Sequence, residues 1–149
     1  MIEERTWFIF IKDLLSELNY RFTEENNFLS MPFPGKTGTL DLIILVGEGA
    51  ILKPTFLTVT GWLPNLVKSK NRVKVLEFLN TKNTEIPIGN FELHGEEEGV
   101  SGSQPSQIVY KFGIEVYPNC MSKEQLLSML GLVLQAVDEI ELEAQELLG

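Results

Sequence analysis

The segment RVKVLEFLNTKNTEIPIGNFELH, residues 72–94, predicts a helix, a stop and a strand in succession, and the rest of the chain can be arranged around it. Apolar residues recur in its first half at three- and four-residue steps, the spacing that places side chains on one face of a helix. Charged residues occupy the other positions, at Arg72, Lys74, Glu77 and Lys82. We therefore expect a helix with one buried side, formed by Val73, Val75, Leu76, Phe78 and Leu79.

The second half of this segment indicates where that helix ends. Asparagine and threonine side chains compete for backbone hydrogen bonds, and proline and glycine do not continue a helix. These residues are Asn80, Asn83, Thr84, Pro87 and Gly89. The following residues, 91–93, alternate in polarity, which predicts a strand with one buried face.

Composition bounds the class of protein. The chain has 149 residues, of which 44% are apolar and 22% charged, values typical of one folded soluble domain spanning residues 1–149. Its formal net charge is −9. Nucleic acids and anionic membranes carry the same sign, so the charge disfavours both as partners.

The N-terminus and the cysteine usage indicate a compartment. The first apolar run, residues 7–11, is short and is preceded by charges, which does not fit a signal peptide. No stretch approaches the roughly 18 apolar residues of a membrane-spanning helix. Cys120 is the single cysteine and forms no internal disulfide. We expect a cytoplasmic protein.

Two terminal segments predict helices with more apolar residues than one buried face needs. In residues 3–19 the expected core stripe is Trp7, Phe10, Ile11, Leu14 and Leu18, which leaves Phe8, Ile9 and Leu15 outside it. Residues 122–148 begin with Ser122 and Gln125, the spacing of a capping box. Their expected core stripe leaves out Leu127, Leu132 and Leu134. Surplus apolar side chains indicate either a partner surface or a second packing layer within the monomer.

The remaining segments predict an antiparallel sheet of about five strands, giving an α+β fold in the order α-βββ-α-ββ-α. Residues 39–46 and 57–62 alternate in polarity on either side of a glycine-containing turn, which predicts a central hairpin. Residues 20–33 indicate a hairpin or a short edge strand, and residues 108–117 a half-buried strand. The second helix is expected to begin after Pro64.

The order of elements and the segment 76–93 resemble the YbjN family of bacterial domains. The matching residues are Leu79, Asn80, Asn83, Pro87, Gly89 and Phe91, and residues 122–140 resemble the family's last helix. The resemblance implies the fold of type III secretion chaperones, an antiparallel sheet with helices packed on it, whose members pair and hold segments of other proteins. It implies no catalytic residues, since the family has none established.

No motif predicts a catalytic, cofactor or metal site. Gly35, Lys36 and Thr37 match the end of a phosphate-binding loop, but Ser30 replaces its first glycine and a strand is expected to follow. His94 has no second histidine or cysteine at ligand spacing, so we interpret it as the end of a strand. Cys120 precedes a helix start that could activate a thiol, although no partner base is identifiable.

Charge runs have simpler interpretations. Glutamates 96–98 lack the spacing of a calcium loop and are expected to keep a mobile loop, residues 95–106, in solvent. The cations at 68, 70, 72 and 74 are interpreted as the solvated start of a helix. Glutamates at 139, 141, 143 and 146 oppose the dipole of the last helix, and indicate either a solvated end or a basic partner.

The sequence therefore predicts a non-enzymatic interaction module, chaperone- or adaptor-like and homodimeric, that requires no cofactor. It would bind a segment of a partner protein through an exposed strand edge or through the surplus apolar positions Phe8, Leu15, Leu127 and Leu134. The alternative is a regulatory sensor that binds a small apolar ligand between sheet and helices. An enzyme would need His94, Cys120 or carboxylates to converge in a pocket.

Overall fold

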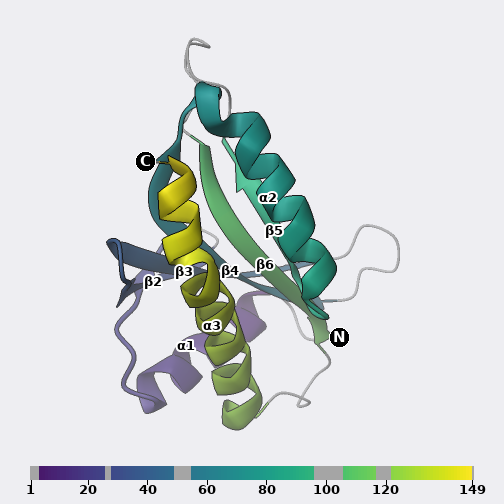
Figure 1. Cartoon of the computed structure of the whole chain (residues 1–149). Coiled ribbons are helices and arrows are strands. Elements are labelled where there is room, and N and C mark those ends of the chain that lie inside the picture. Colours follow the sequence, from purple (N-terminus) through teal and green to yellow (C-terminus); the bar gives the residue numbers. More distant parts are fainter. Residues whose placement is uncertain (1–3, 26–27, 49–54, 96–105, 117–121, 149) are drawn as a thin grey trace.

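The computed structural model of the chain describes residues 4–25, 28–48, 55–95, 106–116 and 122–148. It has an α+β fold in which one antiparallel sheet of six strands carries three α-helices (Figure 1). The elements are α1 (Glu4–Glu17), β1 (Thr23–Glu24), β2 (Phe28–Pro34), β3 (Thr39–Glu48), β4 (Thr55–Val67), the 3₁₀ turn η1 (Ser69–Asn71), α2 (Arg72–Glu85), β5 (Asn90–His94), β6 (Ser106–Val116) and α3 (Lys123–Leu148).

The strands lie in the order β1-β2-β3-β4-β6-β5, and every neighbouring pair is antiparallel. The predicted hairpin of residues 39–46 and 57–62 is confirmed as β3 and β4, and lies at the centre. The predicted short edge strand is also confirmed, as β1, and raises the count from about five strands to six. Its partner β2 contains Pro32 and Pro34, which lack the amide donor of a central strand.

One face of the sheet forms the core together with the helices. The residues of β3 alternate, so that Leu42 and Ile44 are fully buried while Asp41 and Leu45 are exposed on the other face. Gly61 of β4 lies on the buried face, where an added Cβ would be 2.7 Å from Val137. The absence of a side chain at this position lets α3 lie close against the sheet.

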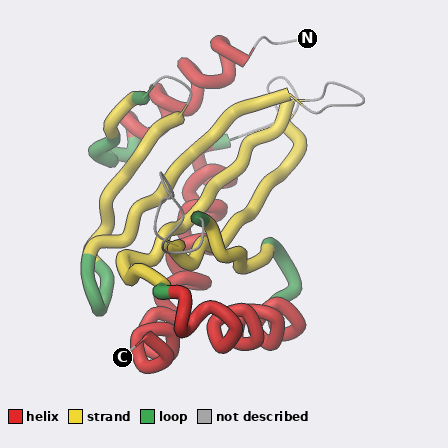
Figure 2. The backbone as a smooth tube through the Cα atoms, turned by 90° about the horizontal axis from the view of Figure 1, so that it is seen from above, coloured by secondary structure: helices red, strands yellow, loops and turns green. Residues whose placement is uncertain are grey.

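The figures show how the helices share this face. Helices α2 and α3 lie side by side in front of the sheet, and α1 lies across its lower end (Figure 1). Seen from above, the sheet is strongly twisted (Figure 2). The last helix begins as predicted. Ser122 Oγ accepts a bond from the Gln125 amide and Gln125 Oε1 accepts one from the Ser122 amide.

Three details of the predicted packing are wrong. Among the described side chains of α1 the buried ones are Phe8, Ile11 and Leu15, so two of the three residues assigned as surplus belong to the core, whereas the third, Ile9, is exposed. In α2 the buried residues are Val75 and Leu79, whereas Val73 and Leu76 are exposed. Sequence periodicity gives the existence of an apolar face, but the rotation of a helix about its axis is set by what it contacts.

The third wrong detail concerns Pro64. The strand predicted over residues 57–62 continues past this proline, because β4 extends to Val67, and α2 begins at Arg72. The register of β4 against β6 shifts between Trp62 and Leu66, and Pro64 lies within this irregularity. An irregular position has no regular ladder bond to lose, which is where proline is tolerated within a sheet.

Candidate interaction surface on helix α3

The turn between β2 and β3 is bound to α3 by one buried carboxylate. Glu141 has no exposed surface, and its side chain accepts three hydrogen bonds from this turn. The Lys36 amide donates to Oε1 at 2.9 Å, and the amide and hydroxyl of Thr37 each donate to Oε2 at 2.5 Å. An added Cβ on Gly35 would lie 2.9 Å from Oε2, so glycine is needed for this approach. We call this contact the Glu141 clasp.

The clasp keeps the carboxylate charged. Burial by itself raises the pKa of Glu141, but the hydrogen bonds from Thr37 and Lys36 stabilise the ionised form and outweigh it, so the pKa lies below its usual value. At the surface of the clasp, Lys36 Nζ pairs with Asp138 at 3.3 Å. The β2–β3 hairpin therefore has a fixed position beside α3.

An apolar depression lies between this hairpin and α3. It has a volume of about 410 Å³ and opens to solvent. Its walls are Phe33, Pro34, Leu40, Leu134, Gln135 and Asp138. About five turns of α3 follow Leu127. Leu134 is two turns further along the helix than Leu127 and lies on the same flank. Leu127 is 42% exposed.

The structure separates the four predicted partner-binding residues. Leu127 and Leu134 lie on the flank of α3 that borders the depression, as an exposed and a partly buried side chain. Phe8 and Leu15 are in the core of α1 and are not accessible. Of the four residues, only the two leucines of α3 have surface that a partner could reach.

Sequence reasoning missed the role of Glu141. The sequence favours a solvated or partner-facing interpretation of the glutamates in the C-terminal segment. For Glu141 the solvated interpretation is wrong, because its side chain is buried. A signal was present, because Glu141 is four residues after Val137 and three before Ala144, both on the buried stripe. A charged residue on such a stripe requires polar partners from another element.

At the opposite edge of the sheet, a neutral side chain of α2 binds the backbone of β5. On α2, Asn83 Nδ2 donates to the Phe91 carbonyl at 3.0 Å, and the Phe91 amide donates to Asn83 Oδ1 at 2.6 Å. This Asn83 clasp pairs the backbone of β5 much as another strand would. On the far side, β1 and the prolines of β2 limit pairing. The Asn83 clasp therefore occupies the outward-facing backbone groups of β5 at Phe91.

The turn before β5 is fixed by Tyr110. Its hydroxyl donates to the Ile88 carbonyl at 2.5 Å. Gly89 has φ +71°, and an added Cβ would overlap the Tyr110 hydroxyl. The predicted stop at proline and glycine is thus confirmed.

Candidate catalytic groups do not converge in the described part of the chain. His94 ends β5 as predicted, with Nε2 2.7 Å from Glu92 Oε2 and its ring against Trp62. Hydrogen bonds from Asn90 and His94 lower the pKa of Glu92. Cys120 and residues 96–105 lie outside the described residues. Gly35–Thr37 form a turn followed by a strand, which agrees with rejecting a phosphate-binding loop.

The described residues show neither a metal-binding cluster nor a membrane-spanning helix. They contain no group of three or more histidine, cysteine, aspartate or glutamate side chains that could hold a metal ion. Within the same ranges, none of the helices is both long enough and apolar enough to cross a membrane.

Comparison with solved structures identifies the fold. No family model and no curated protein matches the chain. A crystal structure of YbjN from E. coli, described as a candidate transcription regulator, superposes with a TM-score of 0.64 over 93% of this chain and 91% of that one. The chain has the fold of YbjN. At 14% identity the likeness is one of fold, so the chain shares a YbjN-like architecture.

Proposed function

We propose that this chain is a non-enzymatic interaction module, adaptor- or chaperone-like, that binds a segment of a partner protein along the flank of α3. The observation that carries the proposal is the open apolar depression beside Leu134, continued along the helix by the exposed Leu127. Exposed apolar side chains next to a preformed depression are typical of a helix or peptide docking site.

The partly occupied sheet edges support this mode of binding. The Asn83 clasp occupies the backbone of β5 at Phe91, and Pro32 and Pro34 remove donors from β2. A partner segment would therefore bind by side chains in the depression and not by adding a strand.

Charge indicates the chemistry of that segment. The chain carries a net charge of −9, and the depression has Asp138 on its wall. A segment that combines an apolar anchor with Lys or Arg would be attracted before contact and retained after it. The description of YbjN as a candidate transcription regulator agrees with a regulatory module, and the acidic charge favours regulation through a protein and not through direct DNA contact.

Affinity capture with matched variants tests the proposal. The tagged chain is incubated with extract of its native cell, and bound proteins are identified by mass spectrometry. Leu127→Asp and Leu134→Asp are each compared with Ile88→Asp, whose side chain is 45% exposed against 42% for Leu127 and lies far along the chain on the α2–β5 turn. We expect a specific partner whose recovery falls about tenfold or more in both α3 variants, since losing an apolar anchor costs roughly 1.5–3 kcal/mol. Equal recovery with all three variants would reject the α3 flank as the binding site.

A small-ligand sensor is the second candidate, and the volume of the depression favours it. About 410 Å³ is within the range of sites that hold small molecules. A thermal shift screen against apolar metabolites tests this function, because a ligand that binds the folded chain raises its melting temperature. A shift abolished by Leu134→Asp would support the sensor, and its absence across the panel would count against it.

A further inference from the structure

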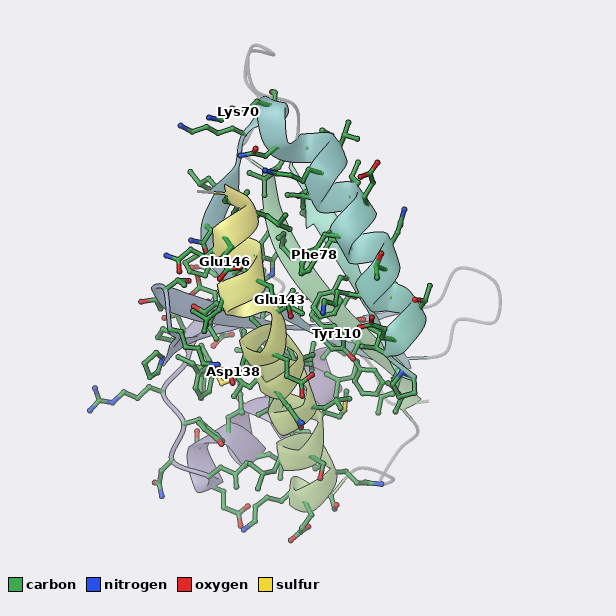
Figure 3. The ribbon with its side chains drawn as sticks, in the orientation of Figure 1. Lys70, Phe78, Tyr110, Asp138, Glu143 and Glu146 are labelled. Atoms are coloured by element: carbon green, nitrogen blue, oxygen red, sulfur yellow. The ribbon has the colours of Figure 1, made fainter. Side chains whose placement is uncertain are left out.

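The α3 side of the depression presents hydrogen-bond acceptors to an occupant. Asp138 lies on this wall, and Figure 3 shows it on the flank of α3 turned away from α2. One turn earlier, Gln135 donates from its amide nitrogen to Glu139 Oε1 at 3.1 Å, which leaves its carbonyl oxygen without a partner among the described residues. The other walls are apolar, formed by Phe33, Pro34, Leu40 and Leu134. This lining matches a group that has an apolar body and a cationic N–H donor.

Lys36 of the chain itself is paired with the carboxylate of Asp138. Its Nζ lies 3.3 Å from Oδ2 and 3.5 Å from the backbone carbonyl oxygen of Asp138. No other cation of the described residues pairs with Asp138. Lys36 is not among the residues that line the depression, so the charged edge of the site is occupied while its apolar part is open.

The Glu141 clasp fixes the backbone of Lys36 but not its side chain. The Lys36 amide donates to Glu141 Oε1, whereas the Lys36 side chain is 47% exposed and that of Asp138 54%. An exposed ion pair contributes little to stability, because water screens the charges and holding two flexible side chains in one geometry costs entropy. A cation from outside can therefore replace Lys36 at Asp138 while the turn stays in place.

We propose that Asp138 is the recognition site for a cation of the partner segment, and that Lys36 is an internal competitor which this cation displaces. The segment would place an apolar side chain against Leu134 and the ammonium group of a neighbouring lysine against Asp138 and Gln135. The inference rests on the proposed function and specifies the chemistry of its partner. Competition from Lys36 lowers the affinity for such a segment, since one ion pair must break as the other forms.

Binding of a small probe to the full chain tests this competition. Phenethylammonium combines an apolar ring with an ammonium group, and phenethyl alcohol is its neutral counterpart. Backbone amide chemical shifts of residues 134–138, followed by NMR during titration, give both dissociation constants for the wild type, Lys36→Gln, Asp138→Asn and the double variant. These substitutions keep the Lys36 amide that binds Glu141 and alter only an exposed pair, so folding is expected to be unchanged.

Removal of the competing charge is expected to strengthen binding of the cationic probe. We expect about threefold tighter phenethylammonium binding in Lys36→Gln and about threefold weaker binding in Asp138→Asn, the scale of one exposed ion pair. The double variant should bind like Asp138→Asn alone, because Lys36 acts only through this carboxylate. Phenethyl alcohol should bind all four proteins equally. Lys123→Gln removes the same charge from an exposed ion pair about four turns away along α3, and should leave both affinities unchanged.

The outcomes separate failure of this inference from failure of the proposed function. An unchanged affinity for phenethylammonium in Lys36→Gln or Asp138→Asn, with phenethyl alcohol still bound, would overturn the roles of these two residues and leave the apolar site in place. A gain from Lys36→Gln that persists in the Asp138→Asn background would show general repulsion instead of competition. Micromolar affinity for the free amine would assign the site to a small ligand and not to a protein segment. If neither probe shifted these amides, the depression would be rejected as an apolar site, and the proposed function with it.

Discussion

The β2–β3 turn and the edge strand β5 are each bound to a helix by a single side chain, and the two side chains differ in charge. On one side the Glu141 clasp joins α3 to the β2–β3 turn through a buried, charged carboxylate. On the other, the Asn83 clasp joins α2 to β5 through a neutral amide at the sheet edge. In both, a helix side chain bonds to backbone groups that no strand pairs, those of the turn or those on the outer side of β5 at Phe91.

The difference follows from which backbone groups need a partner. The β2–β3 turn presents two amide donors and no acceptor to α3, which suits a carboxylate. Phe91 presents one donor and one acceptor, which suits an amide. We expect the charged clasp to be stronger and sensitive to pH, and the neutral one to be weaker and insensitive.

The largest expected effect is that of Glu141→Ala. The substitution leaves the amides of Lys36 and Thr37 without an acceptor next to α3, and each unsatisfied buried donor costs about 1–3 kcal/mol. We expect the free energy of unfolding to fall by about 2–4 kcal/mol in urea denaturation. Gln145→Ala, on an exposed position of the same helix, is the control and should change it by less than about 0.5 kcal/mol. Similar values for both would show that the carboxylate does not hold the turn.

A smaller loss is expected for Asn83→Ala. Two bonds to Phe91 disappear, but β5 is an edge strand and water can reach the vacated groups, so the expected loss is about 1–2 kcal/mol. Asn80→Ala makes the same chemical change on the exposed face of α2 and should be neutral or slightly stabilising, since alanine has the better helix propensity. If Asn83→Ala destabilised the fold more than Glu141→Ala, the ranking of the two clasps would be reversed.

The smallest expected effect is the pH dependence of the stability that Glu141 contributes. The folded pKa of Glu141 is below the ordinary 4.5, so its contribution is fully present above that value and is lost as the pH falls through the folded pKa. The stability gap between wild type and Glu141→Gln should therefore be constant at neutral pH and shrink below about pH 4.5. The gap between wild type and Asn83→Ala should stay constant. Denaturation series over this pH range measure both, and a gap to Glu141→Gln that does not narrow in acid would contradict a charged clasp.

Particular residues show how far the sequence predicts the structure. The capping box at Ser122, the turn at Gly89 and the central β3–β4 hairpin are local or pairwise signals, and each is found as expected. The exposure of Val73 and the burial of Phe8 were not predictable, since periodicity leaves the rotation of a short helix uncertain by one position. Of the four predicted partner-binding residues, Phe8 and Leu15 are buried, whereas Leu127 is exposed and Leu134 partly buried.

The sequence by itself determined the α+β class, the boundaries of most elements and a net charge that disfavours nucleic acid. These properties depend on local spacing and on composition, which a chain carries whatever its tertiary contacts. Only the tertiary structure decided that Glu141 binds the amides of Lys36 and Thr37, more than a hundred residues away in sequence, and that Asn83 binds the backbone of Phe91. Contacts between distant segments depend on how helices cross the sheet, and no local pattern in the sequence encodes that crossing.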